Sequence, residues 1–197
     1  MIRTLTTKKE IILDAALRLV SKKNTLDITI REIASEANVN VAAINYYFKS
    51  KAQLFMEMDK LFMDNFVDAF KPLTDKELSD EDKLRTWLIK ATSYASHYPG
   101  MLVYLKDKFM DENSNDRDIE MKMDLINYIS EIRLLFIEVI KPPVDDGDRL
   151  FMAFMSSIVF PFIADSYLQG MGLDMVEIDQ PDYINLIINK FKSEVVK

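Results

Sequence analysis

The chain has 197 residues, about half of them apolar and none of them cysteine. It is long enough for one sizeable domain, or for a small domain fused to a larger one, and apolar enough to bury a core. Without cysteine it forms neither a disulfide framework nor a thiolate metal site, which fits a reducing cytoplasm. Charged residues precede the first long apolar run, so no secretory signal is expected, and the uncharged stretch 150–164 is too short to span a bilayer. We therefore expect a cytoplasmic protein with no membrane partner.

The net charge of −7 is divided unevenly along the chain. Residues 1–51 hold nine Lys or Arg and five Asp or Glu, a net charge of +4, whereas the remaining residues hold sixteen and twenty-seven, a net charge of −11. A basic head on an acidic body is typical of a polyanion-binding module carried by a domain that does not bind the polyanion. Chance variation between segments gives the same division, so the head has to be judged on its residue pattern.

The N-terminal part of the chain predicts short amphipathic helices. Apolar residues recur at helical spacing over residues 11–20, and Thr6 or Thr7 is positioned to cap that segment. A second, short helix is expected after Thr29, which has Glu32 three residues further on. This is the spacing of a capping box, in which each side chain bonds a free backbone N–H of the other residue.

A third short helix is expected over residues 40–48, with Asn40 as its cap. Turn-forming residues at Pro99-Gly100 and Pro142-Pro143 separate later segments of helical periodicity. Those segments are residues 50–70, 79–98, 101–110, 116–141, 148–169 and 181–196. The chain shows neither strand alternation nor an internal repeat, so the predicted fold class is all-α.

The junction between the second and third helices predicts a tight turn. It reads Ala37-Asn38-Val39-Asn40, and Asn is one of the few residues other than Gly that enters the left-handed backbone region at low cost. Asn38 can therefore end the second helix and let Val39 turn inward before Asn40 starts the third. Two short helices joined this tightly form a helix-turn-helix, whose second helix fits the major groove of DNA.

Helical spacing separates an inward from an outward face on the third helix. Ile44 and Phe48, four residues apart, point back toward the second helix. The outward face carries Val41, Ala42, Asn45 and Tyr46. Such a face is poorly suited to water but well suited to base edges, because Asn bonds adenine bidentately and Ala or Val methyl groups contact the methyl group of thymine.

Three stretches of the head resemble the TetR family of bacterial regulators. They are Ala15-Ala16-Leu17-Arg18-Leu19, Thr29-Ile30-Arg31-Glu32-Ile33-Ala34, and Val39 through Leu54 with Ile44-Asn45-Tyr46-Tyr47-Phe48-Lys49-Ser50-Lys51-Ala52-Gln53-Leu54. The resemblance covers residues 7–55, and the rest of the chain agrees only in being helical and of the right length. It implies a helix-turn-helix DNA-binding domain over residues 1–50, joined by a long helix to a helical ligand-binding and dimerisation domain over residues 51–197.

Carried over position by position, the resemblance implies a set of DNA-binding residues. They are Thr29, Arg31, Asn40, Val41, Ala42, Ala43, Asn45, Tyr46, Tyr47 and Lys51. Many members carry Gly at position 38, Lys or Gln at position 41 and Tyr at position 45, so this chain has fewer polar reading groups and its base preference stays open. Tyr47 could instead pack against the first helix, Arg31 could pair locally, and Lys51 could be a solvated lysine.

The resemblance also implies that the body forms a homodimer and encloses a ligand cavity. The expected dimer interface lies on the last two helices and comprises Phe154, Met155, Ile158, Val159, Phe162, Ile184, Ile187, Ile188 and Phe191. The expected ligand-binding residues are Trp87, Tyr94, Tyr98, Tyr104, Met121, Leu125, Tyr128 and Phe151. Ordinary core packing is the alternative for both sets. Aromatic rings with a few hydroxyls would suit a small, mainly apolar ligand.

We expect a regulator and not an enzyme. A di-iron bundle needs two Glu-x-x-His pairs, and the chain has one histidine, His97, which we expect to be exposed or locally bonded. No phosphate-binding glycine loop or nucleophile elbow is present in the sequence, so we predict no catalytic residues, no metal and no cofactor. The expected partners are a palindromic DNA operator, a second copy of the chain and a small-molecule effector that releases a repressor from DNA. The sequence leaves open an activator, or control by a protein partner.

Overall fold

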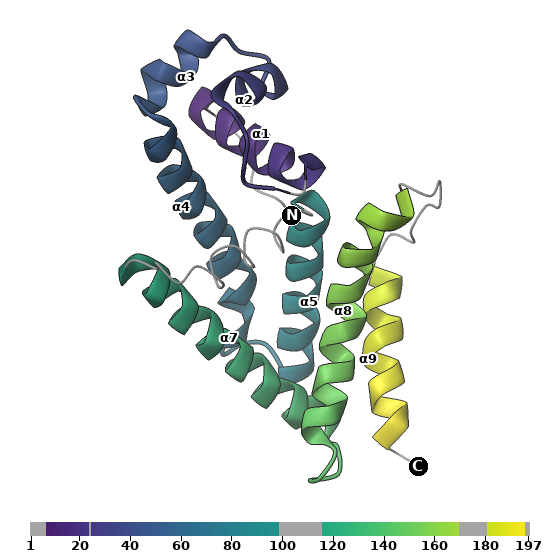
Figure 1. The fold of residues 1–197 in the computed structure, drawn as a ribbon. Coiled ribbons are helices and arrows are strands. Elements are labelled where there is room, and N and C mark those ends of the chain that lie inside the picture. Colours follow the sequence, from purple (N-terminus) through teal and green to yellow (C-terminus); the bar gives the residue numbers. More distant parts are fainter. Residues whose placement is uncertain (1–6, 24, 99–115, 170–180, 196–197) are drawn as a thin grey trace. The chain divides into compact units, whose positions relative to one another are not determined.

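The computed structural model describes residues 7–23, 25–98, 116–169 and 181–195 (Figure 1). Within these ranges the chain forms α-helices, one short 3₁₀ helix and no strand, which confirms the all-α prediction. The elements are α1 (Lys8–Lys23), α2 (Ile30–Glu36), α3 (Val41–Phe48), α4 (Lys51–Phe70), η1 (Lys71–Thr74), α5 (Asp80–His97), α7 (Asp116–Ile140), α8 (Gly147–Gln169) and α9 (Pro181–Val195). None of the described helices combines the length and apolarity needed to cross a bilayer.

Helix ends lie where side chains can cap them. The Thr7 hydroxyl accepts a hydrogen bond from the Glu10 N–H at the start of α1, and Ser50 and Ser79 do the same for α4 and α5. These caps satisfy backbone donors that have no partner inside the helix. The bounds from α3 onward agree with the predicted ones to within one residue at each end. The helix predicted at residues 101–110 lies outside the described residues.

The chain divides into two compact units. Among the described residues, the first unit comprises residues 7–68 together with His97 and Tyr98. The second comprises residues 69–96 and 116–195. The boundary expected after residue 50 therefore falls inside the first unit, because the early part of α4 shares its core with α1, α2 and α3.

The first unit has a single apolar core. Ile12 and Val20 of α1, Ile33 of α2, Phe48 of α3 and Leu54 of α4 are all fully or almost fully buried in it. In Figure 1 the three short helices α1, α2 and α3 gather around one another. Helices of this length are marginal in isolation, so the shared core supplies most of their stability.

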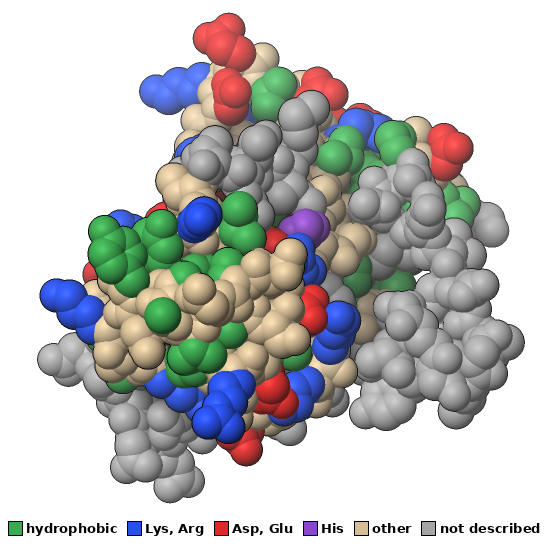
Figure 2. Space-filling view, turned by 90° about the horizontal axis from the view of Figure 1, so that it is seen from above, with side chains coloured by type: hydrophobic (Ala, Val, Ile, Leu, Met, Phe, Trp, Pro, Cys, Tyr) green, Lys and Arg blue, Asp and Glu red, His purple; other side chains and the backbone are tan. Residues whose placement is uncertain are grey.

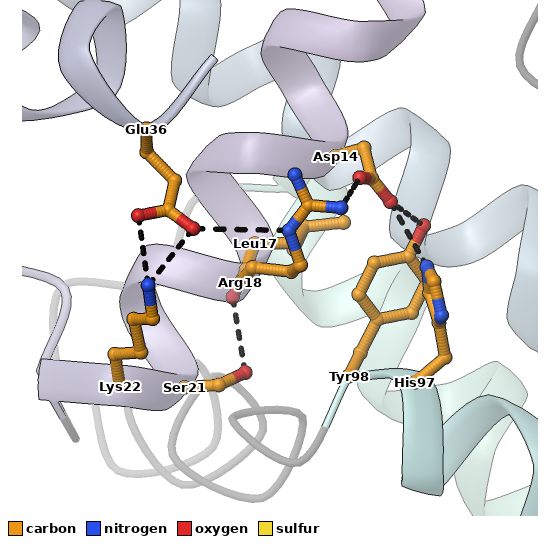
Figure 3. Close-up of polar contacts among 8 residues, drawn as sticks. All are labelled: Asp14, Leu17, Arg18, Ser21, Lys22, Glu36, His97 and Tyr98. Carbon is orange, nitrogen blue, oxygen red and sulfur yellow. Dashed lines mark hydrogen bonds and ion pairs between the residues drawn. The ribbon is translucent and has the colours of Figure 1, made fainter. Parts of the chain in front are cut away.

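Asp14 is a charged side chain buried inside the first unit, with a relative exposure of 1% (Figure 3). Its Oδ1 accepts the Tyr98 hydroxyl proton over 2.8 Å and lies 3.1 Å from Nε2 of His97, and its Oδ2 lies 2.5 Å from NH1 of Arg18. A buried carboxylate is stable only when it is paired and hydrogen-bonded. Asp14 therefore fixes the end of α5 and the residue after it against α1.

The arginine that pairs with Asp14 continues into a surface network. Nε of Arg18 lies 3.9 Å from Oε1 of Glu36 at the end of α2, and Nζ of Lys22 lies 3.0 Å from the other oxygen of that carboxylate (Figure 3). Exposed pairs of this kind contribute little individually. Their effect is to link α1 with α2 around the buried Asp14.

The second unit packs α7, α8 and α9 around a cluster of phenylalanine rings in tilted and edge-on contact. The ring of Phe136 lies 4.7 Å from that of Phe154, 5.7 Å from that of Phe151 and 5.9 Å from that of Phe191, measured between centroids. α8 and α9 run side by side (Figure 1). An ion pair joins α5 to α9, because Nζ of Lys192 lies 2.5 Å from Oε2 of Glu81. The hydrogen bond from Lys192 holds the pKa of the Glu81 carboxyl below its usual value.

Pro161 lies inside α8, where it cannot supply a backbone N–H. The carbonyl that this N–H would reach is that of Ser157, four residues earlier. The Tyr183 hydroxyl of α9 donates a hydrogen bond to the Ser157 carbonyl oxygen over 2.8 Å. A side chain of α9 thus replaces the hydrogen bond that proline removes from α8.

We predict that Tyr183→Phe lowers the free energy of unfolding by about 1 kcal/mol, because a carbonyl inside α8 loses its donor. In a Pro161→Ala background the same substitution should cost clearly less, since the new N–H can bond Ser157. Urea unfolding of the four variants measures this coupling. Tyr46→Phe, at an exposed tyrosine, is the matched control. Equal losses in both backgrounds would contradict the account.

Candidate DNA-binding interface

The turn between α2 and α3 adopts the predicted conformation. Asn38 has φ 52°, in the left-handed region, and the next N–H, that of Val39, donates to the Ala34 carbonyl over 2.9 Å. Asn40 begins α3 as predicted, because its side-chain oxygen accepts a hydrogen bond from the Ala43 N–H over 2.7 Å. These backbone and cap contacts close the turn, and Val39 packs against the core between the two helices.

The capping box at the start of α2 is also confirmed. The Thr29 hydroxyl accepts from the Glu32 N–H over 3.2 Å, and the Glu32 carboxylate accepts from the Thr29 N–H over 2.8 Å. Lys23 lies 2.9 Å from the same carboxylate. The hydrogen bonds from Lys23 and Thr29 lower the pKa of Glu32 from 4.5 to about 2. Thr29 is thus engaged within the head while its side chain stays exposed.

Two buried side chains anchor α3. Ile44 is 1% exposed and Phe48 is fully buried, as their four-residue spacing predicted. On the opposite side Tyr46 is 81% exposed and Val41 is 38% exposed, and Ala42 and Asn45 are exposed beside them. We call these four residues the α3 face. Among the described residues no hydrogen bond engages the Asn45 side-chain amide, so its donor and acceptor are available.

The other predicted DNA-binding residues differ in exposure. Tyr47 and Ala43 are half-buried, and Tyr47 packs against the core with its ring edge-on to that of Tyr46 at 5.2 Å. Arg31 is exposed and, within the described ranges, makes no ion pair. Lys51 is exposed, with its Nζ 5.4 Å from the centre of the Phe55 ring.

Sequence reasoning did not select Lys49, which follows α3. Its φ of 54° is left-handed and its side chain is exposed. Its place between the predicted residues Tyr47 and Lys51 was the signal that could have found it.

In the view from above, green apolar side chains lie among tan atoms, with blue Lys and Arg side chains near them (Figure 2). Apolar groups suit contacts with base edges, and cationic groups suit contacts with phosphates.

The predicted ligand-binding residues do not all lie together. Trp87, Tyr94, Met121 and Phe151 are buried in the second unit, with Leu125 and Tyr128 half-buried there. Tyr104 lies outside the described residues. Tyr98 is in the core of the first unit and gives its hydroxyl proton to Asp14, so it is not available to line a cavity of the body. His97 was expected to be exposed or locally bonded; its ring lies edge-on to that of the neighbouring Tyr98, and its Nε2 also bonds Asp14, which is distant in sequence.

Most of the predicted dimer residues lie inside their own chain. Phe154, Ile158, Ile184, Ile187, Ile188 and Phe191 are buried, and Met155, Val159 and Phe162 are half-buried. Among the described side chains of the two helices, the large apolar ones that are exposed are instead Met152, Phe160 and Leu186, at 65%, 64% and 63% exposure. The prediction rests on apolar residues at helical spacing. This pattern is equally typical of the core-facing side of a helix and of a dimer interface.

Comparisons with known proteins agree with this architecture. The chain is 25% identical over 145 residues to the HTH-type transcriptional regulator BetI of Rhizobium meliloti (strain 1021), covering 73% of this chain and 70% of that protein. It is 23% identical over 182 residues to the probable HTH-type transcriptional regulator YttP of Bacillus subtilis (strain 168), covering 91% and 81%.

Solved structures share the fold. A TetR-like transcriptional regulator from Rhodococcus sp. RHA1 superposes with a TM-score of 0.62 at 17% identity, covering 99% of this chain and 98% of that one. The TetR family regulator PfmR from Thermus thermophilus also gives 0.62, at 18% identity, covering 93% and 97%.

The turn, the caps and the α3 face together define a helix-turn-helix DNA-binding protein. A family model for the bacterial regulatory proteins of the tetR family matches residues 12–58, which span α2, α3 and much of α1 and α4. Over residues 12–58 the chain is therefore similar to the TetR family of bacterial regulators, and as a whole it shares the fold of TetR-family structures.

We predict that acid lowers the folding stability of the first unit by protonating Glu32. Its folded pKa of about 2 lies below the ordinary value of 4.5, so its contribution is present above pH 4.5 and is lost as the pH falls toward 2. Glu32→Gln should lower the free energy of unfolding near neutral pH and reduce its dependence on pH between about 4.5 and 2. Unfolding midpoints followed by circular dichroism between about pH 6 and pH 2 measure the effect. Glu138→Gln, at an exposed position of α7, should leave the profile unchanged.

Proposed function

We propose that the protein is a dimeric repressor that binds a palindromic operator and is released by a small, mainly apolar ligand. The observation that carries the DNA-binding part is the α3 face. Its apolar groups and single amide are exposed, whereas the helix is anchored from behind by Ile44 and Phe48. A helix held in this way can enter a major groove without disturbing the core of the head.

The proposed chemistry follows from the side chains on that face. Asn45 bonds N6 and N7 of an adenine, and the methyl groups of Val41 and Ala42 contact thymine. Tyr46 reaches base or backbone oxygens through its hydroxyl. The exposed cations Arg31, Lys49 and Lys51 contact phosphates, which positions the helix but carries no sequence information. An operator rich in A·T pairs at the contacted positions is expected.

Selection of bound DNA from a random library tests this proposal with the full chain. We expect an inverted repeat whose half-site centres lie about 34–36 Å apart, one helical turn. A reporter placed behind the selected site should be expressed more strongly when the protein is removed. Reduced expression on removal would indicate an activator, and failure to enrich any sequence would contradict specific binding.

We predict that Asn45→Ala and Tyr46→Ala each weaken operator binding by about tenfold or more, since one good base contact is worth roughly 1–3 kcal/mol. The unfolding midpoint should change little, because both side chains are exposed. Fluorescence anisotropy with the selected operator measures the affinity. Asn189→Ala, at an exposed asparagine of α9, is the matched control. Unchanged affinity in both head variants would remove the α3 face as the reading surface.

Exposed apolar side chains on α8 and α9 support a dimer. Met152 and Phe160 are eight residues apart on α8, with the small Ser156 midway between them, so all three share one face. Leu186 is exposed on the neighbouring α9. Large exposed apolar groups on adjacent helices mark an interaction surface. We propose that this surface, with the half-buried Met155 and Val159, pairs with its copy.

We predict that Phe160→Glu shifts the protein toward the monomer and weakens operator binding at least tenfold, because a buried carboxylate at the interface has no partner. Sedimentation velocity at micromolar concentration measures the oligomeric state. Leu134→Glu is the matched control, since Leu134 is 62% exposed on α7 but lies on neither paired helix. Loss of the dimer with Leu134→Glu alone would move the interface to α7.

Release by a ligand requires that body and head be coupled. α4 runs unbroken from Lys51 to Phe70, and it starts in the first unit and ends in the second. We propose that a ligand favouring one conformation of the body changes the orientation of the heads through this helix. A coupling of about 1–3 kcal/mol, or roughly 5–150-fold in affinity, is typical of such control.

A further inference from the structure

Trp87 lies on α5, is 3% exposed and is the only tryptophan of the chain. Its indole Nε1–H is buried and has no hydrogen-bond partner. Within the described ranges it is the one buried side-chain nitrogen or oxygen left in that state. The great majority of buried hydrogen-bond donors in proteins have an acceptor, so an unpaired donor in a folded interior points to a missing acceptor.

The surroundings of this donor are aromatic. The ring of Phe70, at the end of α4, lies 6.1 Å from that of Trp87, and the ring of Tyr128 on α7 lies 4.3 Å from that of Phe70. All three residues belong to the second unit. An indole donor beside tilted aromatic rings is a suitable contact for a ligand that is mostly apolar and has one polar group.

Charge in the neighbourhood restricts that polar group. Burial is the main cause that raises the pKa of Tyr128, and the nearby carboxylates of Asp124 and Glu131 raise it further. An anionic ligand beside this tyrosine would be repelled by both carboxylates and would lose its hydration. The indole nitrogen can only donate. The ligand group that bonds it is therefore a neutral acceptor, such as a carbonyl or ether oxygen.

We propose that the effector is a neutral aromatic or apolar molecule whose carbonyl or ether oxygen accepts a hydrogen bond from Nε1 of Trp87. This deepens the proposed function, because it rests on a ligand site in the body and names its chemical class. Phe70 and Tyr128 contact the apolar part of the molecule. Phe70 is also the last residue of α4, so a ligand at this place contacts the helix that continues into the first unit.

The experiment uses the full chain with ¹⁵N-labelled tryptophan. A single tryptophan gives a single indole N–H signal, so hydrogen bonding at Trp87 is observed directly. The probes are acetophenone, which carries a neutral carbonyl, ethylbenzene, which has no acceptor, and benzoate, which is an anion. Each is titrated to millimolar concentration, and affinity is taken from the shift of this signal and from calorimetry.

We expect acetophenone to shift the indole proton downfield and to bind about two- to tenfold more tightly than ethylbenzene, the effect of one hydrogen bond. Benzoate should bind most weakly. Trp87→Phe should remove the preference for acetophenone while keeping the affinity for ethylbenzene. The wild-type spectrum is informative even if this variant folds poorly.

Several results would overturn the proposal. They are equal affinity for acetophenone and ethylbenzene, tighter binding of benzoate, or no shift of the indole signal with any probe. An indole proton already bonded to a buried water would give the last result. Operator binding, measured on the wild-type protein before any probe is added, separates the two proposals. Absence of operator binding without a probe contradicts the repressor, whereas intact operator binding with an unmoved indole signal contradicts only the Trp87 site.

Discussion

The head depends on the way α3 is held by only two buried side chains, Ile44 and Phe48. Because they lie four residues apart, one stripe of an eight-residue helix is used for packing and the rest of its surface is left outside. This constraint leaves the whole α3 face, Tyr46 and the Asn45 amide included, free of packing contacts with the core. A helix anchored by more residues would have fewer positions for contact with DNA, and one anchored by fewer would not keep a fixed orientation.

Short helices also need their ends satisfied, and the head meets this need with local side chains. The capping box at Thr29 and Glu32 and the cap at Asn40 supply acceptors for N–H groups that the helices themselves leave unpaired. Between them, the left-handed Asn38 allows the turn to close without glycine. Both caps and the turn could be predicted from the sequence, because each depends on residues within three or four positions of one another.

Contacts between distant residues were harder to predict. Tyr98 was predicted to line a cavity because it combines an aromatic ring with a hydroxyl. Its hydroxyl instead donates a hydrogen bond to Asp14, more than eighty residues earlier in the chain. Nothing in the periodicity of α1 shows that a carboxylate on its apolar side requires donors from the end of α5. The same limit applies to α8, where apolar spacing selected Phe154 and Ile158, which are core, and passed over Met152 and Phe160, which are exposed. Spacing indicates that a helix has an apolar side, and tertiary packing decides which side is covered.

The two units also differ in how completely they satisfy buried polar groups. In the first unit even the buried charge of Asp14 has three partners. In the second, α8 loses a backbone donor at Pro161 and recovers a hydrogen bond from Tyr183, whereas the indole of Trp87 has no such replacement. A fully satisfied network favours one rigid arrangement, which a DNA-reading surface requires. An unmet buried donor costs free energy that only a bound acceptor can recover, so the interior of the second unit, unlike that of the first, is not complete in its hydrogen bonds.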